Sequence, residues 1–118
     1  HAQIVDKVCS LIDEAPGKDF SVDDLARTNG YSLEHFGRIF KKTKGISPNQ
    51  YIVQSRLEFA KSLLLTSSMT VSEIAAVSGY NDVYFFSRQF SEKNGLPPSK
   101  FRTFPHVDKK KRRQKPPR

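Results

Sequence analysis

The chain has 118 residues, a length that fits one ordinary domain or two very small ones. Hydrophobic residues make up 36% and charged residues 27%, which is typical of a soluble globular protein; no apolar stretch approaches a membrane span, and no signal peptide is apparent. Cys9 is the only cysteine, which excludes an internal disulfide and fits a reducing compartment, so we expect a cytoplasmic protein without membrane contact.

The formal net charge of +8 is unevenly distributed along the chain. Residues 1–34 contain three Lys or Arg and seven Asp or Glu, a net charge of −4. Residues 35–104 contain ten basic and four acidic residues, and residues 105–118 contain seven basic residues and one acidic residue, so each segment carries +6. An acidic N-terminal segment followed by basic segments is a charge distribution typical of a protein that binds nucleic acid. For the final segment alone, an ordinary solvated surface is the alternative interpretation.

The first expected helix spans residues 2–14. Its apolar residues recur at helical spacing and should form one buried stripe: Ile4, Val5, Val8, Leu11 and Ile12. Cys9 lies beside this stripe, where a lone cysteine usually behaves as a small hydrophobic residue. Pro16 and Gly17 should end the helix.

Two shorter helices should follow. Ser21 is a suitable N-cap for the first, with Asp24 at the capping-box position, and Gly30 should end it. Ser32 is a suitable N-cap for the second, over residues 33–43. Its inward face should be Phe36, Ile39 and Phe40, and Gly45 should close it.

A longer helix should begin at Ser47-Pro48, with Ser47 as N-cap and Pro48 at the first helical position. It is expected to reach about Leu65, and some eighteen residues at about 1.5 Å each give roughly 27 Å. Its apolar residues lie on more than one face: Tyr51, Ile52, Leu57, Ala60, Leu64 and Leu65. This distribution predicts a helix that contacts a structural unit on each side.

The rest of the chain repeats the earlier pattern about fifty residues later. The matched segments are Ser21 to Tyr31 with Thr70 to Tyr80, and Phe36 to Pro48 with Phe86 to Pro98. The second copy carries one extra residue near Asn81. We therefore expect a helix near residues 71–78, a turn at Gly79 and a helix near 82–93. Pro97-Pro98 should begin a last helical turn that contains Phe101 and Phe104.

Each copy has the form of a helix, a glycine-containing turn and a second helix, which is the form of a helix-turn-helix unit. Such a unit is too small to fold alone, so the two copies should share an element. The sequence thus predicts an all-α, homeodomain-like fold of about seven helices: two helix-turn-helix subdomains joined by a long linker helix. The expected boundaries are 1–47 and 67–104 for the subdomains, 48–66 for the linker helix and 105–118 for a disordered basic tail.

A family resemblance covers roughly residues 4–102. Its most specific residues are Ile74-Ala75, Gly79 to Asp82, Tyr84 to Phe90 and Gly95 to Arg102. In these the chain resembles the DNA-binding domain of the AraC/XylS family of bacterial transcription regulators. The resemblance implies that one chain reads two successive major-groove segments of double-stranded operator DNA in the bacterial nucleoid. It also implies an activator that works with RNA polymerase, an effector-binding or dimerisation domain upstream of this sequence, and no cofactor or metal.

The second helix of each unit should carry the base-reading residues. The expected set is Glu34, Gly37, Arg38, Val83, Tyr84, Ser87 and Arg88. An arginine can bind guanine O6 and N7, Glu34 can accept from cytosine N4, and Val83 and Tyr84 suit thymine methyl groups. A surface ion pair between Glu34 and Arg38 is the alternative. Gly37 departs from the family pattern, which often has a reading side chain there, and Phe85 is expected to pack rather than read.

The contacts to the DNA backbone should come from a second group of polar and basic residues. The expected set is Ser32, Lys41, Lys42, Arg56, Asn81, Lys93 and Lys100. Backbone N–H groups at the helix N-termini near Ser32 and Asn81 could add phosphate contacts. Arg102 could instead cap the final helix.

Other kinds of function remain as alternatives. An enzyme is disfavoured because Cys9 and the three histidines show no metal-ligand spacing, and the chain has no Gly-rich phosphate loop and no paired carboxylates in a motif. A non-specific architectural or RNA-binding protein driven by the basic tail is a second alternative. The output domain of a membrane-linked two-component hybrid is a third.

Overall fold

The computed structural model describes residues 1–105, and that part contains seven helices and no strand. In chain order they are α1 (Ala2–Glu14), α2 (Val22–Thr28), α3 (Leu33–Lys44), α4 (Pro48–Thr66), α5 (Val71–Val77), α6 (Val83–Asn94) and α7 (Pro98–Thr103). The predicted all-α fold is therefore confirmed. The predicted basic tail lies outside the described residues, apart from Pro105.

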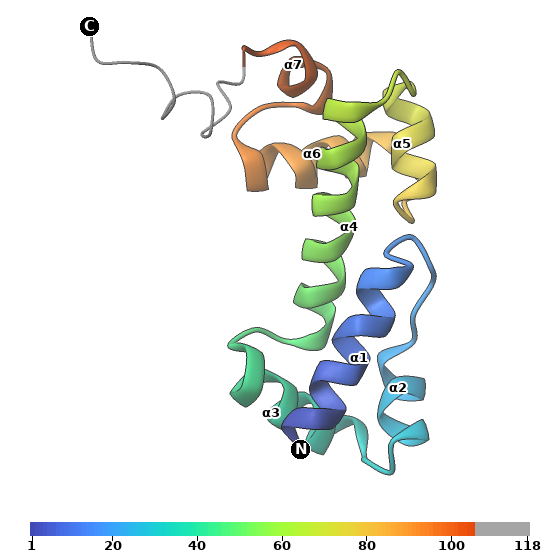
Figure 1. The fold of residues 1–118 in the computed structure, drawn as a ribbon, viewed down its shortest axis with the longest axis vertical. Coiled ribbons are helices and arrows are strands. Elements are labelled where there is room, and N and C mark those ends of the chain that lie inside the picture. The colour runs from blue at the N-terminus through green and yellow to red at the C-terminus, as the bar shows by residue number, and fades with distance from the viewer. Residues whose placement is uncertain (106–118) are drawn as a thin grey trace, which may run out of the picture.

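The long helix α4 joins two helical units that lie at its two ends (Figure 1). Helices α1 and α3 pack against its first half and α2 packs on α3, while α5 and α7 pack against its second half and α6 packs on α5 and α7. The molecule is accordingly elongated, with extents of 55 × 36 × 21 Å. At about 1.5 Å per residue, the 19 residues of α4 span about 28 Å.

Each unit has a hydrophobic core of its own. The first contains Val5, Val8, Cys9, Ile12, Ala26, Phe36, Phe40 and Ile52. The second contains Leu57, Ala60, Leu64, Ile74, Ala75, Tyr80, Phe86, Phe90 and Phe101. Helix α4 supplies Ile52 to one core and Leu57, Ala60 and Leu64 to the other, which explains why its apolar residues lie on more than one face.

The helix ends follow the expected capping chemistry. Ser47 and Gln50 form a complete capping box at α4, and Thr70 forms one with Glu73 at α5. At α2 the box is incomplete: Ser21 accepts from the backbone N–H of Asp24, but the Asp24 carboxylate pairs with Arg27 instead of reaching back. Gly45 and Gly95 end α3 and α6 at φ values of 82° and 81°, which favour glycine.

Three inward positions differ from the prediction. Leu11 is 44% exposed while Cys9 is buried, because the core stripe of α1 is Val5, Val8, Cys9 and Ile12. Leu65 is 49% exposed because it lies beyond the buried side of α4. Phe104 follows the end of α7 and is also largely exposed, so Phe101 alone of the pair enters the second core. Within residues 1–105, no helix combines the length and apolarity that a membrane crossing requires.

Candidate nucleic-acid interface

Helix α3 presents a polar, mostly basic face to solvent. Phe36 and Phe40 are fully buried and fix the opposite side. The side chains of Glu34, Arg38, Lys41 and Lys42 are exposed, and Gly37 is half-buried among them. Sequence reasoning missed one exposed neighbour on this helix, His35, whose ring lies 5.2 Å from that of Tyr31. The exposure of His35 could have been predicted from the sequence, because His35 is adjacent to Phe36 and lies outside the buried stripe of the helix.

The charges on α3 differ in how far they are neutralised. Lys44 contacts Asp6 of α1 at 3.0 Å, and this hydrogen bond raises the pKa of Lys44. Lys41 and Lys42 make no ion pair within residues 1–105, and Glu34 and Arg38 do not pair with each other there. The surface ion pair that was the alternative for Glu34 and Arg38 is therefore not formed in this structure, and both groups are available to a ligand.

Helix α6 presents a more aromatic face. Tyr84 is 76% exposed, and Arg88 is exposed with its guanidinium carbon 5.7 Å from the centre of the Phe85 ring. Phe85 also lies 6.1 Å from the ring of Tyr80, so it packs on one side and supports Arg88 on the other. Val83 and Ser87 are half-buried, and they flank the exposed face rather than lie at its centre.

The N-termini of the two second helices carry different charges. Ser32 caps α3, its hydroxyl accepting from the backbone N–H of His35 at 3.1 Å. At α6 the N-cap is Asp82 rather than Asn81, and its carboxylate accepts from the N–H groups of Tyr84 and Phe85. The expectation of a helix N-terminus at Asn81 was wrong by one residue, because the adjacent Asp82 is an equally suitable cap and takes that position. A phosphate would therefore meet the Asp82 carboxylate at the cap of α6, whereas at α3 it would meet a neutral cap with the Glu34 carboxylate in the first turn.

Two arginines bind backbone carbonyl groups of distant residues. The Arg56 guanidinium donates to the carbonyls of Pro16 at 3.2 Å and Lys18 at 3.1 Å. Arg102 donates to the carbonyls of Leu64 at 3.1 Å and Ser67 at 3.2 Å. Arg102 thus caps the C-terminal end of α4 rather than that of α7, which corrects the expectation. The phosphate contact of Arg56 stays a prediction, although its Nε and one of its Nη atoms already donate to carbonyls of this chain.

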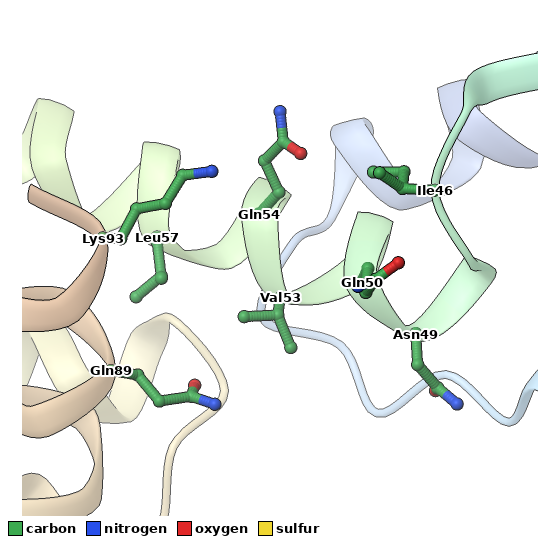
Figure 2. A pocket seen from close by; sticks show the side chains of 8 residues that line it. All are labelled: Ile46, Asn49, Gln50, Val53, Gln54, Leu57, Gln89 and Lys93. Atoms are coloured by element: carbon green, nitrogen blue, oxygen red, sulfur yellow. The ribbon is translucent and has the colours of Figure 1, made fainter.

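Lys93 lies beside a hollow of about 400 Å³ between α4 and α6. Figure 2 shows Lys93 and Gln89 projecting from α6 toward α4, with Val53 and Leu57 among the lining residues. Lys93 is therefore on the side of α6 that faces the linker helix. Lys100 is exposed on α7. The predicted base-reading residues of both units reach the surface or flank it, while the predicted backbone contacts are spread over several elements.

Two helix-turn-helix units on one shared helix, each with an exposed second helix, define a duplicated helix-turn-helix protein. A family model described as a helix-turn-helix domain matches residues 25–103. The chain belongs to the AraC/XylS-type helix-turn-helix family.

Individual relatives agree with this assignment. The Msm operon regulatory protein of Streptococcus mutans is 32% identical over 98 residues, which cover 83% of this chain and 35% of that protein. The lactose operon transcription activator of Staphylococcus xylosus is 32% identical over 85 residues, covering 72% and 30%. The crystal structure of the DNA-binding domain of AdpA, described as a global transcriptional factor in complex with a target DNA, is 28% identical with a TM-score of 0.79, covering 83% of this chain and 88% of that one.

The chain spans about a third of the length of the curated relatives it matches. What is similar is thus the helix-turn-helix part of longer regulators.

Proposed function

We propose that this chain binds double-stranded DNA in a sequence-specific manner, with α3 and α6 entering two successive segments of the major groove. The observation that carries the proposal is the duplication itself: two exposed second helices are held by the single helix α4. A length of about 28 Å is of the order of one DNA turn, which is about 34 Å. The two helices can therefore reach neighbouring grooves on one side of a duplex.

In this proposal α3 and α6 contact DNA through different kinds of side chain. Arg38 and Glu34 read base edges in one groove, with Lys41 and Lys42 on the phosphates beside it. Tyr84 and Arg88 read the other groove, with Val83 and Ser87 at the edge of the contact. The exposure of Arg38, Tyr84 and Arg88 supports their assignment, and the basic charge of α3 supplies a long-range attraction to DNA.

The whole protein is proposed to be a bacterial transcription regulator that acts as an activator in the nucleoid and contacts RNA polymerase. The support is the naming of relatives as an operon regulatory protein and as a transcription activator, and of a structural neighbour in complex with its target DNA. An effector-binding or dimerisation domain upstream of this sequence is part of the same proposal, since the chain matches only part of those relatives.

Selection of bound duplexes from a random DNA pool tests the proposed function. We expect enrichment of two short elements whose centres are about 10 base pairs apart, because each second helix reads one of them. Enrichment of one short element alone would contradict simultaneous binding by both units. Equal recovery of all sequences would contradict sequence-specific binding altogether.

A further inference from the structure

The two units touch at a second place besides α4. The loop between α1 and α2 lies near the C-terminal end of α5 (Figure 1). A Cβ atom at Gly17 would lie 2.1 Å from the carbonyl oxygen of Val77, so only glycine permits this approach. Gly79, at φ +95°, faces the same loop, and a Cβ there would lie 3.1 Å from the carbonyl oxygen of Gly17. The backbones of the two units are therefore in direct contact.

Arg56 of α4 holds this contact together. Its guanidinium donates to the carbonyls of Pro16 and Lys18 in the first unit, and it lies 5.9 Å from the ring centre of Tyr80 in the second. We name the interunit joint as the set Pro16, Gly17, Lys18, Arg56, Val77, Gly79 and Tyr80. A charge-assisted hydrogen bond is among the stronger polar interactions in proteins, so Arg56 is well suited to fasten the loop.

The joint continues directly to α6. The Tyr80 side chain is 7% exposed, and its hydroxyl donates to the Gln89 side chain at 2.6 Å. Burial raises the pKa of Tyr80, so this hydroxyl remains protonated and able to donate. The ring of Tyr80 also lies 6.1 Å from that of Phe85, on which Arg88 rests. A displacement of the α1–α2 loop would therefore be transmitted to the helix that is proposed to read DNA.

We propose that the interunit joint fixes the relative placement of α3 and α6 and thereby selects the spacing of the two half-sites. Arg56 and Gly17 act as positioning residues, and the inference rests on the proposed function. Each unit has its own core, so without the joint α4 alone connects them, and a lone helix can bend. Each base pair inserted between half-sites shifts the second by about 3.4 Å and turns it by about 34°. A fixed pair of helices cannot follow such a change.

Two variants of the chain test the role of the interunit joint, and each alters the joint by a different chemical change. Arg56→Ala removes the guanidinium, and Gly17→Ala introduces the clash with the Val77 carbonyl without altering charge. Lys7→Ala is the matched control, because it removes one positive charge from an exposed position of α1. Thermal unfolding of each variant first establishes that both units remain folded.

Binding is then measured on duplexes whose half-sites are separated by the selected distance and by one or two base pairs more or less. We expect the wild type and Lys7→Ala to prefer the selected spacing by about tenfold or more. Both joint variants should reduce this preference to about threefold or less. If both keep the wild-type preference, the joint does not set the spacing and the inference is overturned.

The dependence on salt separates this role of Arg56 from a phosphate contact. A phosphate contact predicts that Arg56→Ala weakens binding at every spacing equally and flattens the salt slope by about one unit, while Gly17→Ala changes nothing. That pattern would overturn the inference. A broader spacing profile in both variants with an unchanged salt slope supports it.

A measurement without DNA distinguishes failure of the joint from failure of the proposed function. Spin labels attached at Thr43→Cys on α3 and Glu92→Cys on α6 report the distance between the two helices, and the native Cys9 is buried. We expect a narrow distance distribution in the otherwise wild-type chain and a broader one with Arg56→Ala or Gly17→Ala. An unchanged distribution contradicts the joint. A wild-type chain that prefers no paired site contradicts the proposed function, and the spacing role falls with it.

Discussion

Arg38 and Arg88 occupy equivalent places in the two copies but have different surroundings. The guanidinium of Arg88 lies over the ring of Phe85, whereas the residue equivalent to Phe85 in the first copy is His35. Arg38 has no such aromatic contact in the described residues 1–105. Arg88 therefore has less side-chain freedom to lose on binding, which favours a stronger contact by Arg88 than by Arg38.

Substitution of these arginines tests the assignment of base-reading residues. Arg38→Ala and Arg88→Ala should each lose about 1–3 kcal/mol of binding free energy on the selected site and relax the preference at one base position. Titration against the selected site and its single-base variants measures both effects. Lys42→Ala is the comparison, since loss of a phosphate contact should weaken all sequences alike. If the arginine variants also act uniformly, they contact the backbone instead.

Cys9 is a second residue whose surroundings predict its behaviour. Burial in the first core raises the pKa of its thiol, so the reactive thiolate is scarcer near pH 7 than in an exposed cysteine. We expect slow reaction with a thiol reagent in the folded protein and fast reaction after denaturation. Because the pKa is raised, the reaction of the folded protein should accelerate only at alkaline pH. Fast reaction near pH 7 in the folded state would instead indicate an activated thiol.

At the scale of the element, α3 is weakened by a glycine at its centre. A Cβ atom at Gly37 would have no neighbour within 4 Å, so no packing requires glycine there. Gly79 is the opposite case, since its φ of +95° and the nearby Arg56 side chain both disfavour any larger residue. The structure of this chain thus explains why residue 79 is glycine, but it does not explain why residue 37 is glycine.

Gly37→Ala should stabilise the protein by about 1 kcal/mol, because it removes the helix-propensity cost of glycine without a clash. Gly79→Ala should destabilise it, and urea unfolding measures both. A measurement of DNA affinity then tests why position 37 is a glycine. A loss of affinity in the more stable Gly37→Ala protein would mean that α3 approaches DNA too closely for a side chain, whereas unchanged affinity would mean that the first unit is merely less stable.

The elements themselves were largely predictable because their signals are local. Ser47, Thr70 and Gly45 act within a few residues, so the helix boundaries fell within one or two residues of those observed. The error at Asn81 arose because two adjacent polar residues can both cap a helix. Contacts of Arg56 and Arg102 could not be predicted, since their carbonyl partners lie 35 to 40 residues away and depend on how the units pack.

In the predicted interface, too, features set by local sequence were predictable and features set by tertiary packing were not. Exposure of Arg38 and Tyr84 follows from helical period, because Phe36 and Phe86 must point inward. The contact between Arg88 and Phe85 does not follow from helical period, because the position of the Phe85 ring depends on its packing against Tyr80. Which residues touch DNA remains a prediction that binding experiments must test.

At the scale of the molecule, the basic segment 105–118 adds charge to that of the two units. We expect its removal to weaken binding to every duplex and to flatten the salt slope, while the ratio between the selected site and random DNA is retained. Titrations of the chain with and without residues 105–118 at several salt concentrations measure this. If all affinity is lost with the segment, the two units are only a scaffold and the architectural alternative is correct.

The division of buried side chains between two separate clusters has an evolutionary consequence. Phe36 and Phe86 belong to different clusters, and within residues 1–105 the two clusters share no buried residue, so a substitution that loosens the packing around Phe36 acts first on the core of its own unit. If both units read DNA as proposed, one half of the protein can acquire a new base preference at some cost in its own stability while the other half keeps the chain on its site. Under the proposed function, the recognised DNA site can then change one half-site at a time.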